Sequence, residues 1–439
     1  MRAAVLLHPV SSGGISRFQR QLIAALARVA PDMAFDVIAG DELIVRDHLE
    51  ARLAMPNVTL IALSECGVSP ATIAGAVSPT LVGVSALRRW GRRVPFAKKL
   101  YHAAGGSRAD GLAPWHHFSA SDGVLKRLED ADVVYLPSPF FTEPFRISRP
   151  VVATLHDLNW KHGFPGNFTP AMSELLDRQS AAWLASANTV VFDSDFIAGE
   201  FRTFFSDAAC RTAVVHLSAF TDRDASAPLP DVLGRLHLPR RFLLNASGMS
   251  GHKNVVGLLD AYQKLTRLHQ GTPPLLLSGA GTQSIANESV EPHGDDVLSV
   301  VNRFLFGSNL VVGRDVFGIG YVSDADMDAL SQACALMVAP SFYEGSAGPP
   351  FDAWHSGVPL ALSRIPTYVE HMQLLGAEGW LFAPADPVSI AEAMGRAFDD
   401  EAECQRMVVQ SRRAMDAYTW DDVAVGYLAV LEAAVRSSV

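Results

Sequence analysis

The sequence predicts an α/β fold built from two Rossmann-like domains. Short apolar runs of strand length alternate with segments of helical periodicity along nearly the whole chain. The order of strand, glycine loop and helix that opens the chain over residues 3–30 repeats over residues 241–265. With 439 residues, the chain exceeds what one hydrophobic core usually supports, so two domains of about 200 residues each are expected.

The composition narrows the class of protein. A formal net charge of −10 argues against general nucleic-acid binding, which favours a basic surface. Four cysteines lie far apart, without CxxC spacing or a nearby histidine cluster, so we expect neither a zinc site nor disulfide bonds. This pattern of cysteines fits a reducing, cytoplasmic setting. The apolar run at the N-terminus is too short for a signal peptide. The sequence contains no run of 18 apolar residues, so we expect no membrane-spanning helix.

The first domain is predicted to cover residues 1–217. Its expected strands are Ala3–His8, Phe35–Ala39, Val58–Leu63, Asp132–Leu136, Val151–Leu155, Thr189–Ser194 and Thr212–Leu217. After the first strand, Gly13 and Gly14 either form a simple turn or let the backbone approach a phosphate or an acceptor hydroxyl. After the fifth strand, His156 and Asp157 are placed either to contact a substrate or to make structural hydrogen bonds.

An insertion is expected at about residues 64–121, because the alternation of strands and helices breaks there. Within it, Arg88, Arg89, Arg92 and Arg93 are interleaved with tryptophan and leucine. Such a cluster either docks on an anionic membrane surface or is the solvated face of an ordinary helix.

A linker rich in proline is predicted at residues 218–239, followed by a second domain at 240–418 and a C-terminal helix at 419–439 that packs back on the first domain. The expected strands of the second domain begin with Arg241–Ala246 and Leu275–Gly279. In the loop after Arg241–Ala246, Lys253 stands beside His252 as a pair of cations suited to neutralising a diphosphate. The loop lacks the P-loop pattern.

The stretch 339–359 carries two carboxylates, Glu344 and Asp352, between two apolar runs of strand length. Two prolines suit the first turn of a helix, Gly357 suits its C-terminal cap, and the unpaired N–H groups at the start of the helix suit an anion. This favours a phosphorylated ligand such as a sugar nucleotide. The alternative is a capped connection in which Asp352 only complements the helix dipole.

Taken together, these motifs resemble the retaining glycosyltransferases of family four, the group-one glycosyltransferases, over nearly the whole chain. The segments that match are Gly13–Phe18, His156–Leu158, Lys253–Asn254, Gly320–Asp324 and Pro340–Gly345 running to Gly357–Pro359. The resemblance implies the GT-B fold, in which two Rossmann-like domains face each other across a cleft. The chain also resembles bacterial mannosyltransferases of polysaccharide assembly.

The resemblance also implies roles for individual residues. Catalytic roles would fall to His156, Lys253 and Glu344, with Glu344 holding the donor sugar and Lys253 the departing diphosphate. Asp352 would bind the ribose, and Tyr321 and Val322 the base. The remaining substrate-binding residues would be Gly13, Gly14, Asp157, Ser250, His252, Gly345, Ser346, Ala347 and Gly348. Asp352 stands where the family usually has glutamate, and His252 where it often has arginine.

We therefore expect a retaining hexosyltransferase that needs no metal or other cofactor. The expected donor is GDP-mannose and the expected acceptor a saccharide, lipid-linked, at the inner face of a bacterial membrane. UDP-glucose, UDP-galactose and N-acetylhexosamine donors stay open. Two alternatives are a nucleotide-sugar hydrolase or phosphorylase-like enzyme and a non-catalytic member of the family that binds glycans.

Overall fold

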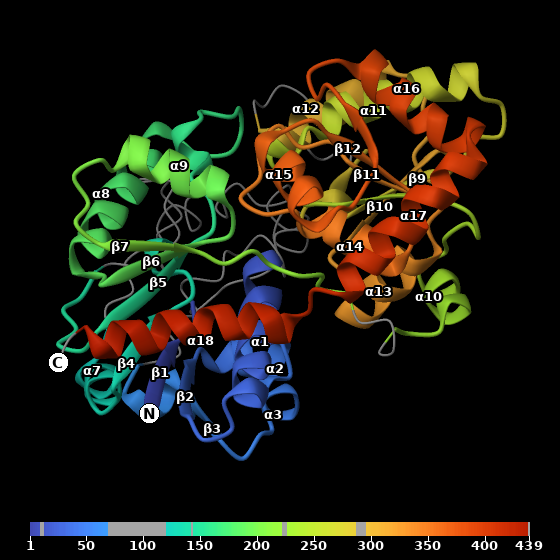
Figure 1. The fold of residues 1–439 in the computed structure, drawn as a ribbon. Helices are drawn as coiled ribbons and strands as arrows, with labels where there is room; N and C mark the ends of the chain where they lie inside the picture. Colours follow the sequence, from blue (N-terminus) through green and yellow to red (C-terminus); the bar gives the residue numbers. More distant parts are fainter. Residues whose placement is uncertain (9–12, 69–119, 142–143, 222–225, 287–295, 438–439) are drawn as a thin grey trace, which may run out of the picture.

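A computed structural model describes residues 1–8, 13–68, 120–141, 144–221, 226–286 and 296–437. It contains two parallel β-sheets, each covered by helices on both faces, in two domains that lie side by side (Figure 1). The basic cluster predicted at Arg88–Arg93, and most of the insertion around it, lie outside the described residues.

The first domain holds a seven-stranded sheet in the order β3-β2-β1-β4-β5-β6-β7. Its strands are β1 (Arg2–Leu6), β2 (Ala34–Ala39), β3 (Val58–Ala62), β4 (Val133–Leu136), β5 (Val151–Leu155), β6 (Thr189–Phe192) and β7 (Arg211–Val214). Its helices are α1 (Gly14–Val29), α2 (Asp41–Arg46), α3 (Leu49–Arg52), α7 (Asp122–Glu129), α8 (Pro170–Ser186) and α9 (Asp195–Phe204).

The second domain holds a six-stranded sheet in the order β10-β9-β8-β11-β12-β13. Its strands are β8 (Leu243–Ala246), β9 (Leu275–Ser278), β10 (Val316–Gly320), β11 (Leu336–Ala339), β12 (Leu360–Ser363) and β13 (Trp380–Phe382). Its helices are α10 (Leu229–Arg235), α11 (Val255–Leu268), α12 (Val297–Gly307), α13 (Asp324–Ala333), α14 (Gly348–Ser356), α15 (Pro366–Leu375), α16 (Pro387–Asp399) and α17 (Glu401–Asp416).

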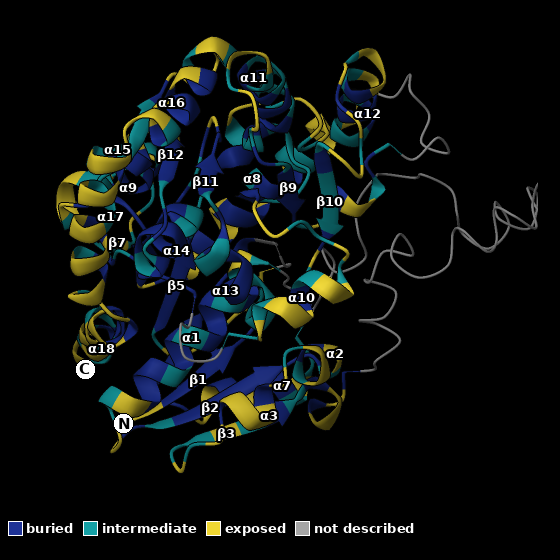
Figure 2. Cartoon of the chain, turned by 90° about the vertical axis from the view of Figure 1, so that its right-hand side faces the viewer, coloured by how far each residue is buried: buried dark blue, intermediate teal, exposed yellow. Residues whose placement is uncertain are grey.

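The inner strands of both sheets are buried on both faces, which explains why they appear in the sequence as continuous apolar runs (Figure 2). The edge strands β3, β7, β10 and β13 are partly exposed. Pairing is parallel throughout; Val5, for example, pairs with Val37 of β2 and with Tyr135 of β4. Local signals set several helix ends. Thr169 and Ser194 cap α8 and α9 by accepting backbone N–H bonds.

The linker predicted at residues 218–239 contains a helix, α10, which begins at the Leu229-Pro230 pair. Proline is compatible with the first turn of a helix, so Pro230 starts α10 and does not mark irregular chain. Arg235 of α10 pairs with Asp326 of α13 at 2.5 Å, so this part of the linker packs on the second domain.

The chain crosses between the domains twice, after β7 and again after α17, and the two crossings bind each other. Ser218 donates to the Tyr418 carbonyl at 2.7 Å, and the Trp420 indole donates to the Ala219 carbonyl at 2.6 Å. Beyond the second crossing, α18 (Trp420–Arg436) packs along α1 of the first domain (Figure 1). There the Tyr427 hydroxyl lies 3.1 Å from Thr154 Oγ1 on β5.

Among the helices of the described ranges, none is both long and apolar enough to cross a membrane. All four cysteines are described, and all four are free.

Candidate active site

Polar loops from both domains meet where their parallel strands end. His156 and Asp157 follow β5 of the first domain, while the Lys253 loop follows β8 and the Glu344 loop follows β11 of the second. In open parallel sheets, ligands bind beyond the carboxyl ends of the strands. The boundary between the domains therefore holds the candidate site.

Lys253 and Glu344 form an ion pair at this boundary. Lys253 Nζ lies 2.7 Å from each carboxylate oxygen of Glu344, and Ser341 Oγ donates to Oε1 of the same carboxylate. The side chains of Lys253 and Glu344 are 22% and 11% exposed, so both charges are largely withdrawn from water but remain accessible. A cation beside an acceptor carboxylate suits a ligand that has both an anionic group and hydroxyls.

Gly345 brings the Glu344 loop into contact with the first domain. A side chain on Gly345 would lie 1.7 Å from the His156 carbonyl oxygen, so only glycine allows this approach. The Gly345 carbonyl also accepts a 2.9 Å hydrogen bond from Ser194, the N-cap of α9. The structure thus brings His156, Glu344 and Lys253 to one place, as the sequence predicts.

Both ring nitrogens of His156 have protein partners, and its expected contact with a substrate stays a prediction. Its Nδ1 lies 2.7 Å from Asp193 Oδ2 and its Nε2 lies 3.0 Å from the Pro137 carbonyl oxygen. Burial alone would lower the pKa of His156, but the Asp193 carboxylate outweighs it and raises the pKa. Asp193 thus favours the protonated form of His156, whose backbone carbonyl faces Gly345.

Asp157 is partly buried near the pair formed by Lys253 and Glu344. Its Oδ1 accepts a 3.1 Å hydrogen bond from the Asn159 backbone N–H. Burial raises the pKa of Asp157, while Lys253 acts in the opposite direction.

His252 is not the second cation that the sequence predicts. Burial and the neighbouring Lys253 lower the pKa of His252 to about 4, so the ring is neutral at pH 7. Its Nδ1 lies 2.8 Å from Asn167 Nδ2 and 3.1 Å from Ser250 Oγ. A neutral imidazole can accept the Asn167 amide proton, whereas an imidazolium could not.

The helix after Glu344 starts as predicted, with Gly348, Pro349 and Pro350 in its first turn and Gly357 as a left-handed C-terminal cap. Ala347 is its N-cap. The hydroxyl of Ser346 is buried and has no hydrogen-bond partner among the described residues. Unpaired N–H groups at a helix start, next to an unpartnered hydroxyl, form a local site for an anion.

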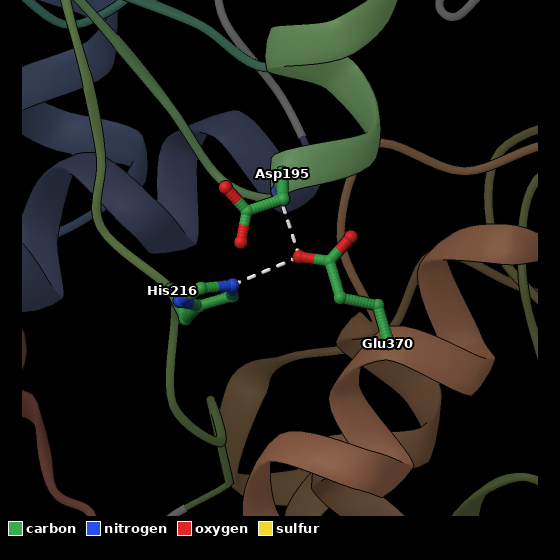
Figure 3. Close-up of side chains that lie close together, drawn as sticks. All are labelled: Asp195, His216 and Glu370. Atoms are coloured by element: carbon green, nitrogen blue, oxygen red, sulfur yellow. Dashed lines mark hydrogen bonds and ion pairs between the residues drawn. The ribbon is translucent and has the colours of Figure 1, made fainter.

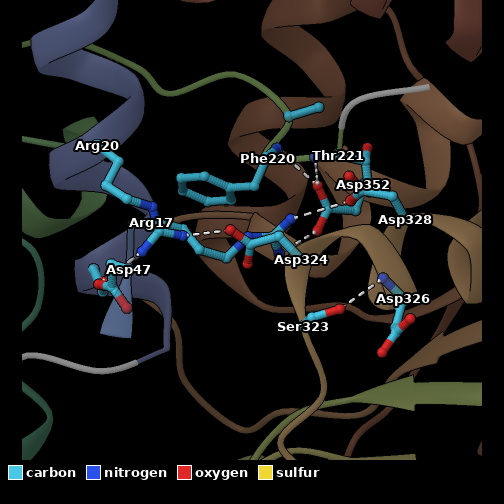
Figure 4. Close-up of polar contacts among 12 residues, drawn as sticks. Arg17, Arg20, Asp47, Phe220, Thr221, Ser323, Asp324, Asp326, Asp328 and Asp352 are labelled. Carbon is cyan, nitrogen blue, oxygen red and sulfur yellow. Dashed lines mark hydrogen bonds and ion pairs between the residues drawn. The ribbon is translucent and has the colours of Figure 1, made fainter. Parts of the chain in front are cut away.

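Asp352 lies further along α14 than the first turn, and both of its oxygens are engaged (Figure 4). Oδ1 accepts the backbone N–H groups of Phe220 and Thr221 at 2.8 and 2.9 Å. Oδ2 lies 3.3 Å from Arg17 Nη1 on α1. Asp352 thus joins the second domain to the first crossing and to α1, and its expected role at the ribose stays a prediction.

The remaining predicted residues lie around this boundary. Gly13 has a φ of 64° and is the N-cap of α1, and a side chain on Gly13 or Gly14 would meet no atom within 4 Å. Tyr321 is 58% exposed after β10, and Val322 packs against the core.

A second polar cluster, Asp195, His216 and Glu370, has the spacing of a metal site, with ligand atoms within 4.8 Å of one another (Figure 3). Its hydrogen bonds give it a different role. Glu370 of α15 accepts the backbone N–H groups of Asp195 and Phe196 at 2.7 and 2.9 Å, and lies 2.9 Å from His216 Nε2. Glu370 therefore caps α9 of the opposite domain.

Three residues of this boundary have no place in the sequence-based prediction: Arg17, Asn167 and Asp193. A signal existed for Asp193, which follows β6 as His156 follows β5. For Asn167 the signal was the Phe164-Pro165-Gly166-Asn167 turn, whose residues suit a type II turn.

The comparisons with known proteins agree with this geometry. Residues 235–414 match the family model described as glycosyl transferases group 1. The chain is 28% identical over 296 residues to the O-antigen chain mannosyltransferase B of Escherichia coli, covering 66% of this chain and 72% of that protein. It is 27% identical over 187 residues to the serotype-specific mannosyltransferase WbdA of E. coli, 43% of this chain and only 21% of WbdA.

Solved structures show the same two-domain architecture. Sucrose-phosphate synthase from Thermosynechococcus elongatus aligns over 100% of both chains with a TM-score of 0.63 and 18% identity. Anabaena HepE in complex with UDP-glucose aligns over 98% of this chain and 99% of that chain, with a TM-score of 0.60 and 16% identity. The two-domain architecture is that of the GT-B fold. The similarity to the group 1 glycosyltransferases covers the second domain, residues 235–414.

Proposed function

We propose that the protein is a retaining hexosyltransferase that moves mannose from GDP-mannose to a saccharide acceptor during polysaccharide assembly. The observation that carries the proposal is the contact between Lys253 and Glu344 at the domain boundary, 2.7 Å from Nζ to either oxygen. Mannose is favoured because both E. coli relatives are named as mannosyltransferases.

In the proposed reaction, the bond between the anomeric carbon and the diphosphate oxygen breaks, and the acceptor oxygen bonds to the same carbon on the same face. The acceptor proton leaves with the diphosphate. Lys253 and the N-terminus of α14 take up the negative charge that develops on the diphosphate. Glu344 accepts hydrogen bonds from sugar hydroxyls and so orients the anomeric carbon.

The acceptor is proposed to enter along the first domain, where Gly13 and Gly14 have open space. His156 contributes its backbone carbonyl, which faces Gly345, and Asp157 lies next to it. We further propose that no metal takes part, because Lys253 supplies the positive charge. Turnover that is unchanged by EDTA would agree with this, and loss of turnover that Mg²⁺ restores would contradict it.

Donor choice is tested by a thermal-shift screen of GDP-mannose, UDP-glucose, UDP-galactose and UDP-N-acetylglucosamine. A ligand that binds only the folded state raises its stability in proportion to ln(1 + [L]/Kd). GDP-mannose should give the largest shift, and Glu344→Ala should reduce it. A larger shift with a UDP-sugar would overturn the choice of donor without affecting the reaction class.

The acceptor is proposed to be lipid-linked, with the protein held at the cytoplasmic face of a membrane by the basic segment Arg88–Arg93. Charge reversal of Arg88, Arg89, Arg92 and Arg93 should weaken binding to anionic liposomes, and binding of the native chain should fall with salt. If the native protein and the charge-reversed variant bound anionic liposomes equally at low salt, the membrane proposal would be refuted.

A further inference from the structure

The loop that carries Lys253 is held from two sides. On the side of the second domain, Asn254 adopts a left-handed conformation with φ 54° and ψ 38°. Its side-chain amide donates to the carbonyls of Pro340 and Pro384 at 3.0 and 2.7 Å. The carbonyl of His252 also accepts a 2.7 Å hydrogen bond from the Phe342 backbone N–H. These contacts stay within one domain and fix the C-terminal side of the loop.

On the other side, one side chain of the first domain binds three consecutive residues of the same loop. Asn167 Oδ1 accepts the Gly251 backbone N–H at 2.8 Å and also the Ser250 hydroxyl. Asn167 Nδ2 donates to His252 Nδ1 at 2.8 Å. The amide of Asn167 therefore uses both its acceptor and its donor on the loop immediately before Lys253.

The turn that presents Asn167 fits closely against the loop. Pro165 and Gly166, whose φ is 74°, occupy the central positions, and the Asn167 N–H donates to the Phe164 carbonyl at 3.2 Å. A side chain on Gly251 would lie 2.0 Å from the Pro165 carbonyl oxygen, so the two backbones touch. The turn at residues 164–167 and the loop at residues 250–252 therefore contact each other through their backbones as well as through the Asn167 side chain.

This contact also accounts for the histidine at position 252. The Asn167 amide needs an acceptor at that place, and a neutral imidazole provides one. The low pKa of His252, about 4, keeps the ring in the accepting form at neutral pH. An arginine, which has no acceptor, could not make this hydrogen bond.

We propose that Asn167 is a positioning residue through which closure of the two domains sets Lys253 in place for transfer. The inference rests on the proposed role of Lys253 as the group that meets the diphosphate. Asn167 does not touch the reacting atoms. It fixes the N-terminal side of the loop only when the first domain lies against the second, so Lys253 reaches its working position in the closed arrangement.

The first test is Asn167→Ala, compared with Asn309→Ala, an exposed asparagine of the second domain. Asn167→Ala should lower kcat about tenfold or more, because small errors in placing a catalytic group are costly, and should change the donor KM by less than threefold. Asn309→Ala should match the native chain. A native kcat in Asn167→Ala would overturn the proposal.

The second test is a double-mutant cycle with His252→Ala. If Asn167 acts through His252 and its neighbours, the two substitutions should not be additive, and the double variant should resemble Asn167→Ala alone. Fully additive effects on kcat would contradict a shared contact.

The third test does not need turnover, and so separates this inference from the proposed function. Hydrogen exchange of the peptide that contains Gly251 should speed up in Asn167→Ala and stay native in Asn309→Ala. Unchanged exchange refutes the contact even if GDP-mannose is the donor. If exchange is faster in Asn167→Ala but its kcat equals that of the unsubstituted protein, the positioning role is refuted. If the unsubstituted protein turns over no nucleotide sugar, the proposed function is refuted and, with it, the role assigned to Asn167.

Discussion

Arg17 of the first domain and Asp352 of the second form a partly buried ion pair, with 3.3 Å between Nη1 and Oδ2 (Figure 4). Two more aspartates of the second domain lie near the same guanidinium, Asp324 at 3.6 Å and Asp328 at 3.5 Å. Burial opposes the charged form of Arg17, but the three carboxylates outweigh it and raise its pKa. The start of α1 is therefore tied to the second domain by charge.

The first prediction follows from this pair. Asp352→Ala leaves two backbone N–H groups and part of the Arg17 charge without an acceptor, so the free energy of unfolding should fall by about 3 kcal/mol. Urea denaturation measures this, with Asp32→Ala as an exposed control. If Asp352 instead served only the donor ribose, stability would be native and only donor affinity would fall.

The second prediction concerns the charge at the diphosphate. Lys253→Met should lower kcat by about 100-fold or more, since a preorganised charge acts where negative charge develops. Lys264→Met is the matched control, because Lys264 pairs with Asp260 on the following helix α11, away from the boundary. Steady-state kinetics with a saturating donor would measure kcat for both variants. Equal kcat values would contradict the role of Lys253.

The third prediction is a pH dependence that comes from His252. Its folded-state pKa, about 4, lies below the ordinary value of 6.5, so the unfolded chain takes up the proton first. The contribution of neutral His252 to the free energy of unfolding is fully present above pH 6.5 and is lost as the pH falls toward 4. The loss is about 3 kcal/mol at most. Urea midpoints at pH 7, 5.5 and 4 should fall more steeply for the native chain than for His252→Gln. Parallel curves would contradict a buried neutral ring.

The fourth prediction has the opposite sign and concerns His156. Because Asp193 raises its folded-state pKa, the stability from this pair is present below pH 6.5 and is lost as the pH rises through the raised value. An NMR titration should show His156 protonated above pH 6.5, and Asp193→Asn should lower its pKa. Asp195→Asn, two residues later on the exposed start of α9, should leave it unchanged. If the pKa of His156 in Asp193→Asn equalled that in the unsubstituted protein, the pairing of His156 with Asp193 would be ruled out.

The inner strands could be predicted closely because each is a local apolar run that is buried on both faces. The prediction for Val151–Leu155 has the bounds that the structure shows, and the prediction for Val58–Leu63 differs by one residue. The helix α10 was missed because Pro230 was taken as a sign of irregular chain, although proline is compatible with a first turn.

The contacts across the domain boundary could not be read from local patterns. Nothing near Asp352 in the sequence shows that Phe220, more than a hundred residues earlier, presents its N–H to that carboxylate. In the same way, the position of His252 beside Lys253 suggested a pair of cations, whereas burial and the charge of Lys253 lower the pKa of His252 to about 4. Docking between domains sets these roles.

The central claim is transfer with retention from GDP-mannose, and the most direct measurement is NMR of the product. The native chain would be incubated with GDP-mannose and a soluble mannoside acceptor, with Glu344→Ala as the inactive control. The account predicts a new disaccharide whose anomeric carbon keeps the α configuration of the donor. A β-linked product, or free mannose released at the same rate with and without acceptor, would contradict it.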